Sequence, residues 1–225
     1  MKLYYHPVST TSRPVMMFAA DAGIALDYEV VDLFTGAHLT PAYTALNPSQ
    51  QVPVLEDGDF RLTECSAILK YLADKVQSPA YPTELQPRAR VNERMDWLNT
   101  GLARDLLYGF CYPQSLPHLK RPDDAAQAST IAWAAQNARR WLGILDEQLI
   151  GPRNTYLCGD QITLADYLGA GMLSHGEVEH LDYAHWRNIT RWLGAMKSRP
   201  NWAQVHEPFQ QYWVQPCAGN TYATL

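Results

Sequence analysis

The sequence predicts an α+β protein, with a small domain of mixed strands and helices followed by an all-helical domain. Three observations support this prediction. Short β-prone and helical segments alternate over residues 1–76, residues 77–87 hold prolines without a hydrophobic period, and apolar residues recur at helical spacing from Arg88 onward. We therefore expect domains at 1–76 and 88–225, joined by a linker at 77–87.

The first three elements are predicted from local patterns near the N-terminus. Residues 2–5 are a short β-prone run. Ser12 and Pro14 are typical of the cap and first turn of a helix, which continues to Ala22. Residues 26–33 alternate in polarity and predict a second strand.

The next elements complete the first domain. A short helix begins at Thr40 and must end before Asn47, because the residue preceding a proline is disfavoured in the α conformation. The apolar runs 52–55 and 60–62 flank an Asp-Gly pair and predict a hairpin, and residues 66–75 have helical spacing. The order β-α-β-α-β-β-α is that of a thioredoxin-like domain.

The second domain is expected to be all-α. Its clearest signals are the glycine and proline after residue 150, the proline after residue 199, and the capping-box spacing of Thr163 and Asp166. The expected helices cover 88–111, 123–150, a segment from 163, 184–198 and 202–212, and the tail from Val214 is expected to be irregular.

The composition excludes several classes of protein. Apolar residues make up 47% and charged residues 18%, which excludes disorder for most of the chain. The net charge of −5 does not suit a nucleic-acid partner, which usually requires an excess of basic residues. No apolar run approaches the roughly 20 residues that span a bilayer, so no membrane partner is expected.

The N-terminus and the cysteines indicate a cytoplasmic location. Pro7 interrupts the chain before the apolar region of a secretory signal could form. The four cysteines lie far apart, with no Cys-x-x-Cys pair and no histidine at zinc spacing, so we expect reduced thiols and no metal site.

Four motifs, in this order and spacing, point to one family. They are YYHPVSTTSR at 4–13, NPSQQVPVL at 47–55, TECSAILKYL at 63–72 and TLAD at 163–166. Together they resemble the cytosolic glutathione transferases, and the serine placement is most similar to the theta- and delta-type and related bacterial members. The resemblance implies a homodimer and glutathione as co-substrate, with no permanently bound cofactor.

Ser9 stands where the first strand is predicted to turn into the first helix. Backbone N–H groups at a helix start stabilise an anion, and a hydroxyl there can donate to a thiolate. From the residues alone, Ser9 could simply end the strand. The resemblance makes Ser9 the catalytic residue that donates to the sulfur of glutathione, with Ser12 as the competing hydroxyl.

The resemblance also implies residues that bind glutathione. The Val52–Pro53 bond is expected to be cis, with the backbone of Val52 pairing with the cysteinyl part, although an ordinary edge-strand proline is the alternative. Glu64 is expected to orient the γ-glutamyl amine, and Cys65 and Ser66 to hold its carboxylate.

Cys65 departs from the family pattern, which usually has serine at this position. A thiol is a weaker donor, so weaker glutathione binding or compensation by Ser66 is expected. The alternative is a reactive Cys65, because helix N-termini lower the pKa of thiols. His38 is expected near the glycyl carboxylate, where Gln51, or Gln50 in its place, would make a neutral contact that is weaker than a charged one.

A small hydrophobic electrophile is expected to bind between the two domains. The candidate contacts are Ser12, Asn99, Arg104, Tyr108 and Tyr112, with Trp213 and the tail as candidates to close the cleft. Packing in the helical core is the alternative for the aromatic residues.

The predicted function is therefore conjugation of the glutathione thiolate to small electrophiles. Two alternatives stay open at this point: glutathione-dependent disulfide or peroxide reduction on the same fold, and a non-catalytic binding protein.

Overall fold

The computed structural model describes residues 1–225, and the first third of the chain forms a four-stranded sheet with three helices. The sheet order is β2-β1-β3-β4, with β1 parallel to β2 and antiparallel to β3, and β4 antiparallel to β3. The predicted thioredoxin-like order is confirmed. Its elements are β1 (Lys2–Tyr5), α1 (Ser12–Asp21), β2 (Asp27–Val30), α2 (Pro41–Leu46), β3 (Val54–Asp57), β4 (Phe60–Leu62) and α3 (Cys65–Lys75).

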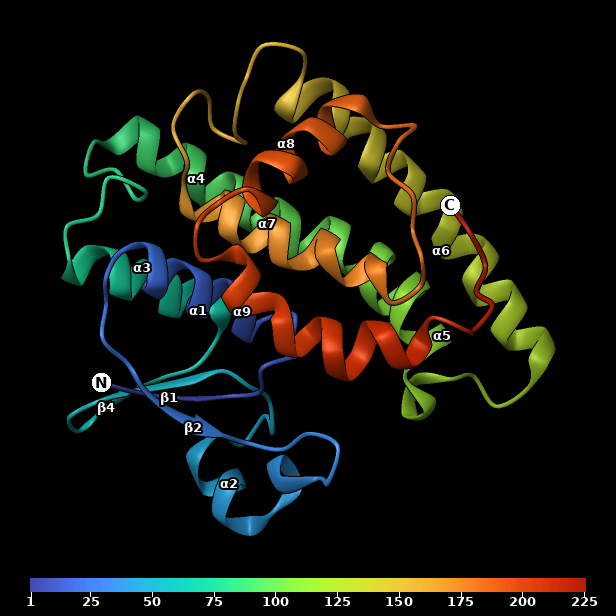
Figure 1. The fold of residues 1–225 in the computed structure, drawn as a ribbon, viewed down its shortest axis with the longest axis horizontal. Coiled ribbons are helices and arrows are strands. Elements are labelled where there is room, and N and C mark those ends of the chain that lie inside the picture. The colour runs from blue at the N-terminus through green and yellow to red at the C-terminus, as the bar shows by residue number, and fades with distance from the viewer.

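Helices cover both faces of this sheet. Figure 1 shows α2 on one side and α1 and α3 on the other, next to the remaining helices. Neighbouring residues of β3 point to opposite faces. Val54 packs with Tyr43 of α2, whereas Leu55 joins the main core with Leu3, its partner across the strands.

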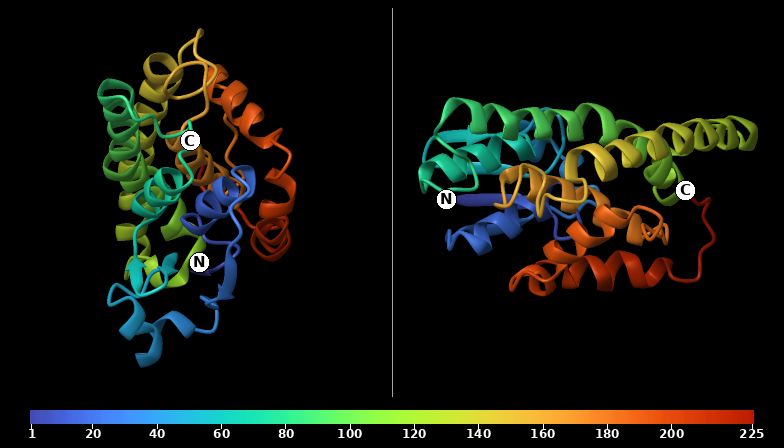
Figure 2. Two further views of the ribbon diagram at one scale, coloured as in Figure 1. Left: turned by 90° about the vertical axis from the view of Figure 1, so that its left-hand side faces the viewer. Right: turned by 90° about the horizontal axis from the view of Figure 1, so that it is seen from above.

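The rest of the chain is mainly helical. In Figure 2, α7 lies in the middle, with α4 and α6 on one side of it and α8 and α9 on the other. Every residue of α7 is buried, and its sequence is mainly apolar, with Asp166 and Ser174 among its few polar residues. The helices are α4 (Leu85–Trp97), α5 (Tyr112–Ser115), α6 (Asp124–Ile144), α7 (Leu164–Ser174), α8 (Arg187–Lys197) and α9 (Trp202–Phe209). Two of them continue as π-helical segments, α4 over Leu98–Cys111 and α6 over Leu145–Ile150.

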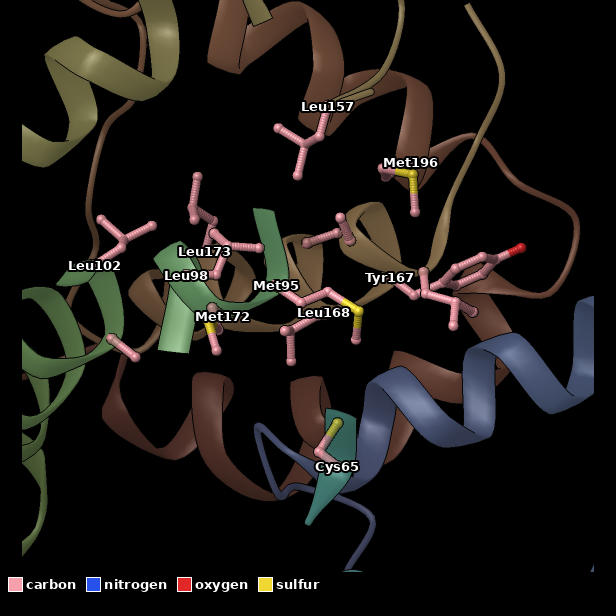
Figure 3. Close-up of a cluster of buried hydrophobic side chains, with 14 of the residues drawn as sticks. Cys65, Met95, Leu98, Leu102, Leu157, Tyr167, Leu168, Met172, Leu173 and Met196 are labelled. Carbon is pink, nitrogen blue, oxygen red and sulfur yellow. The ribbon is translucent and has the colours of Figure 1, made fainter. Parts of the chain in front are cut away.

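A single core joins the sheet to the helices. It contains 45 buried residues from both parts of the chain. Figure 3 shows Met95 of α4 and Leu168 and Met172 of α7 in this cluster, with Cys65 of α3 beside them. The two parts therefore fold against each other over a continuous apolar contact.

The predicted capping box at the start of α7 is present. The Asp166 carboxylate accepts the Thr163 N–H at 2.8 Å, and it also accepts the Leu157 N–H at 2.8 Å and Trp192 Nε1 at 2.9 Å. Burial raises the pKa of Asp166 despite these donors. One carboxylate thus ties the start of α7 to the preceding loop and to α8.

Two expected helix boundaries are wrong. α4 begins at Leu85, not Arg88, because Pro87 lies in the first helical turn, where a missing N–H costs no hydrogen bond. The tail is not wholly irregular, since residues 210–214 extend the last helix and Gln215–Cys217 form a 3₁₀ turn.

The two parts of the chain approach each other closely at Gly171 of α7. A Cβ atom added there would lie 2.4 Å from Cγ of Pro14 and 3.2 Å from the carbonyl oxygen of Thr10. Only glycine lets α7 pack so closely on the segment that joins β1 to α1.

We predict that Gly171→Ala lowers the free energy of unfolding by about 1–3 kcal/mol, because the new methyl group overlaps Pro14. Gly143→Ala in α6 is the matched control, since no atom lies within 4 Å of its added Cβ. The free energy of unfolding of this control should rise by up to about 1 kcal/mol, because alanine has a higher helix propensity than glycine. Urea denaturation measures both, and equal effects would contradict the close approach.

A second prediction concerns acid stability and His206 of α9. Burial, and to a smaller extent the Arg13 charge, lowers the pKa of His206 to about 3, and the ring stacks on Trp202 with the ring centroids 3.6 Å apart. Between about pH 3 and the ordinary histidine pKa of about 6.5, His206 therefore binds a proton more readily in the unfolded chain than in the folded one. The free energy of unfolding should thus fall as the pH drops from about 6.5 toward 3. His206→Gln should flatten this slope in thermal melts, with exposed His118→Gln as control. An unchanged slope in His206→Gln would contradict the prediction.

Candidate active site

The turn between β1 and α1 places the Ser9 hydroxyl at a helix start. Its Oγ accepts hydrogen bonds from the backbone N–H groups of Thr11 at 3.3 Å and Ser12 at 3.2 Å. Both lone pairs of the oxygen are occupied in this way, so its own proton remains available for donation. The helix start adds positive potential, and the turn can therefore stabilise an anion that lies against Ser9.

The loop before β3 lies against this turn. Thr11 Oγ1 donates to the carbonyl oxygen of Val52 at 2.8 Å and lies 3.1 Å from Ser9 Oγ. The Val52–Pro53 peptide bond is cis, as predicted. The Val52 N–H makes no hydrogen bond within the chain. An extended peptide can therefore pair with Val52 beside the Ser9 hydroxyl.

The start of α3 suits a carboxylate. Glu64, just before the helix, has φ 67° and ψ 118°, a strained conformation for a residue with a side chain. No side chain caps the helix, so the first N–H groups, at Cys65 and Ser66, are open to an anion. Ser66 Oγ accepts from Asn99 Nδ2 at 2.8 Å, which leaves its proton free.

The Cys65 thiol faces the core. The residue is buried within the main cluster, as Figure 3 shows. Burial raises the pKa of this thiol and the Glu64 carboxylate raises it further. The alternative of a reactive Cys65 is therefore wrong, because apolar burial outweighs the helix N-terminus.

Gln50 and Gln51 differ in how far their side chains are engaged. Gln50 Nε2 donates to Thr44 Oγ1 at 3.0 Å. The Gln51 carbonyl accepts from the Tyr43 hydroxyl at 2.8 Å and from Asn47 Nδ2 at 2.9 Å, while its side chain is exposed. Gln51 is therefore the freer of the two to meet a ligand.

His38 lies in the 3₁₀ turn Ala37–Leu39. Its Nδ1 is buried and has no hydrogen-bond partner, an arrangement that can receive a ligand oxygen. Burial lowers the pKa of His6, and His38 lowers it further against the opposing effect of Asp32, so the two histidines are near each other.

Ser12 is buried beneath the turn. It is the first residue of α1, has 0% exposure, and its Oγ accepts the His6 N–H at 3.5 Å. The expected cap at Ser12 is wrong, because the Ser9 hydroxyl accepts the N–H groups at the helix start. Ser12 therefore offers no exposed surface to an electrophile.

Asn99 and Arg104 already have partners. Asn99 is bonded to Ser66 at the start of α3. Arg104 donates to both carboxylate oxygens of Asp105, at 3.0 and 2.8 Å, and Asp105 also accepts Trp141 Nε1 of α6 at 2.6 Å. Asn99 thus lies at the candidate site, whereas Arg104 is held beside α6.

Five aromatic rings form a continuous wall from both parts of the chain. The successive ring centroids of Tyr108, Tyr112, His175, Trp213 and Phe34 lie 5.0, 4.8, 5.0 and 6.3 Å apart. Phe34 follows β2, and the other four belong to the helical part. This aromatic wall therefore crosses between the two parts, and its exposed ends, Tyr108 and Phe34, can contact an apolar ligand.

The aromatic wall meets the Ser9 turn through Thr10. Thr10 Oγ1 lies 3.3 Å from His175 Nδ1, and His175 Nε2 lies 3.5 Å from Glu179 Oε1. At the other end, Tyr108 is exposed, and its protein surroundings and the Glu64 carboxylate both raise the pKa of its hydroxyl. Sequence reasoning missed Thr10 and His175, because their contact joins residues 165 positions apart.

Arg13 anchors the turn from the helical side. Its side chain is fully buried, NH1 donates to Ser174 Oγ at 2.7 Å, and the guanidinium lies 3.8 Å from the centroid of Phe209. Burial lowers the pKa of Arg13 to about 10.

Two cavities lie away from this turn. One of about 700 Å³ lies between α6 and tail residues 221–224, and another of about 400 Å³ is lined by Phe18 and Tyr167. Neither includes Ser9, so the candidate site rests on its polar groups. No group of three or more metal-ligating side chains occurs. None of the helices has the length and apolar composition needed to cross a membrane.

Comparison with known proteins agrees with this arrangement. The family described as "Glutathione S-transferase, N-terminal domain" matches residues 1–74, and "Glutathione S-transferase, C-terminal domain" matches residues 114–200. Human glutathione S-transferase theta-1 is 35% identical over 178 residues, which cover 78% of this chain and 72% of the human protein. Glutathione S-transferase theta-1 of Bos taurus is 36% identical over 178 residues, which also cover 78% of this chain and 72% of that protein.

Solved structures of similar proteins superpose along nearly the whole chain. Human glutathione transferase theta-2, solved with glutathione and an unknown ligand, gives a TM-score of 0.82 at 28% identity, covering 100% of this chain and 93% of that one. A delta-class glutathione transferase of Nilaparvata lugens gives a TM-score of 0.79 at 30% identity, covering 96% of this chain and 98% of that one. This chain therefore belongs to the glutathione S-transferase family.

Proposed function

We propose that this enzyme transfers the sulfur of glutathione, as the thiolate, to small hydrophobic electrophiles. The observation that carries the proposal is the hydrogen bonding of Ser9, whose oxygen accepts two N–H groups and whose proton is left for an anion. The similarity to theta-class glutathione S-transferases, one of them solved with glutathione, supports it.

In this proposal, glutathione lies along the edge of the site as an added extended strand. The Val52 N–H and carbonyl pair with the cysteinyl part, beside Ser9. The N–H groups of Cys65 and Ser66 bind the γ-glutamyl carboxylate, and Glu64 orients the amine.

The glycyl end would lie near the loop around α2. His38 has a buried ring nitrogen without a partner, and Gln51 has an exposed side chain. Because the glutamine amide is neutral, its bond to the glycyl carboxylate would be weaker than one from a charged residue, and Gln50 would remain with Thr44.

Thiolate formation supplies only a small part of the rate. A free thiol with a pKa of about 8.5 is roughly 3% ionised at about pH 7, and lowering that pKa by about two units makes it roughly three-quarters ionised. The lower basicity reduces nucleophilicity by roughly eightfold, so the net gain is about threefold. Most of the acceleration must therefore come from holding the electrophile against the sulfur.

The aromatic wall is proposed to perform that positioning. Its exposed rings are Tyr108 at one end and Phe34 at the other, whereas Tyr112 and His175 between them are buried and support these ends. A small hydrophobic electrophile between these rings and the Ser9 turn would exclude water from the sulfur.

The reductase and binding-protein alternatives are not favoured, because the similar proteins are named transferases. Activity with an aryl halide and with 2-hydroxyethyl disulfide separates transfer from reduction. We expect the aryl halide to be the better substrate, and the reverse preference would overturn the proposal.

We also propose domains at 1–76 and 88–225 joined by 77–87, a homodimer and a cytoplasmic location. The four free cysteines support a reducing compartment. Sedimentation equilibrium tests the homodimer, and a monomer at micromolar concentration would refute it.

We predict that Ser9→Ala lowers turnover at least about tenfold with little change in glutathione affinity, because the lost donor acts only on the thiolate. Steady-state kinetics with an aryl halide measure the effect. The variant also loses the acceptor for two N–H groups, so thermal melts must show that it is folded at the assay temperature. Ser198→Ala, at the end of α8, is the control, and an unchanged turnover in Ser9→Ala would reject Ser9 as the sulfur partner.

We predict that Cys65→Ser changes the affinity for glutathione by less than about twofold, because the side chain at position 65 faces the core and the backbone N–H groups at the start of α3 would hold the γ-glutamyl carboxylate. A gain of about fivefold or more would contradict this prediction and show that the side chain reaches the ligand. Calorimetry measures the affinity, with Cys158→Ser as the matched control away from the site. Unchanged affinity would show that the backbone N–H groups alone hold the carboxylate.

A further inference from the structure

The Thr11 hydroxyl connects the proposed sulfur donor to the backbone that would hold the ligand. Its oxygen lies 3.1 Å from Ser9 Oγ and 2.8 Å from the carbonyl oxygen of Val52. These contacts join the β1–α1 turn to the loop before β3, two segments that are 41 residues apart along the chain.

The hydrogens in this chain of contacts can be assigned by counting donors and acceptors. A carbonyl oxygen only accepts, so the bond to Val52 uses the Thr11 hydroxyl proton. Ser9 Oγ already accepts the N–H groups of Thr11 and Ser12, which occupy its two lone pairs. The proton between the two hydroxyls therefore belongs to Ser9, and Thr11 accepts it.

Ser9 has one hydroxyl proton and two competing acceptors for it. In the absence of ligand the proton points to Thr11, whose oxygen is held in place by Val52. A thiolate is a stronger acceptor because its bond to the hydroxyl is charge-assisted. Ser9 must nevertheless break its bond to Thr11 before it can donate to sulfur.

We propose that Thr11 is a positioning residue. By accepting the Ser9 proton, the Thr11 hydroxyl holds that proton away from the sulfur and so opposes thiolate formation in bound glutathione. The inference rests on the proposed function of Ser9 and adds a second residue to it. Removing the Thr11 hydroxyl leaves the Ser9 proton without a protein acceptor, and sulfur becomes its best partner once the ligand has excluded water.

The test compares Thr11→Val, which keeps the shape but loses the hydroxyl, with Thr11→Ser, which keeps the hydroxyl. Ultraviolet difference absorption of the bound thiolate, followed against pH, gives the pKa of glutathione in each complex. We expect Thr11→Val to lower that pKa by about half to one unit, the equivalent of one neutral hydrogen bond. The acid limb of kcat/KM should move by the same amount, and Thr11→Ser should behave as the parent protein.

Three controls separate this effect from other causes. Thr10→Val removes the neighbouring hydroxyl, which faces His175, and should leave the thiol pKa unchanged. S-methylglutathione cannot ionise at sulfur, so its affinity should be equal for the parent and Thr11→Val. In a Ser9→Ala background, Thr11→Val should have no effect on the thiol pKa, because the two hydroxyls then no longer interact.

An unchanged or raised thiol pKa in Thr11→Val would overturn the inference, as would the same shift in the Ser9→Ala background. A different result would refute the proposed function. If Ser9→Ala leaves the thiol pKa of bound glutathione unchanged, Ser9 is not the sulfur partner. If Ser9→Ala raises it and Thr11→Val does not lower it, only the role of Thr11 is wrong.

Discussion

The Ser9 hydroxyl accepts two backbone N–H groups at the start of α1, and the candidate site depends on this interaction. It fixes the oxygen, satisfies donors that a helix start would otherwise leave open, and leaves one hydroxyl proton for donation. The same atom thus serves the fold and the proposed chemistry. Because the oxygen is fixed, only the hydroxyl proton has to turn from Thr11 when an anion arrives, and a small reorganisation of this kind favours electrostatic stabilisation.

The turn keeps its place because the helical part of the chain packs on it from behind. Gly171 allows contact with Pro14, and Arg13 reaches Ser174 across the boundary. Arg13 and Glu179 are buried with polar atoms that lack partners, which is costly in an apolar interior. Arg13 belongs to the first turn of α1, and Glu179 contacts His175, the neighbour of Thr10, so both groups lie close to the Ser9 turn.

Much of the fold follows from local signals that act over a few residues. The Asp-Gly hairpin and the capping box of Asp166 were predictable, because each depends on a residue type at a fixed spacing. The cis bond before Pro53 was expected only from the family resemblance. The cap of α1 was assigned to Ser12 instead of Ser9, since both serines have suitable spacing and only the path of the turn distinguishes them.

The sequence by itself determined the order of elements, the position of Ser9 between a strand and a helix, and the resemblance to a family. Tertiary structure decided which groups meet: Thr11 with Val52, Thr10 with His175, and the aromatic wall across the two parts of the chain. It also decided that Cys65 is buried and unreactive. Hydrogen bonding and burial between distant segments depend on how helices pack, and periodicity along the chain carries no information about that packing.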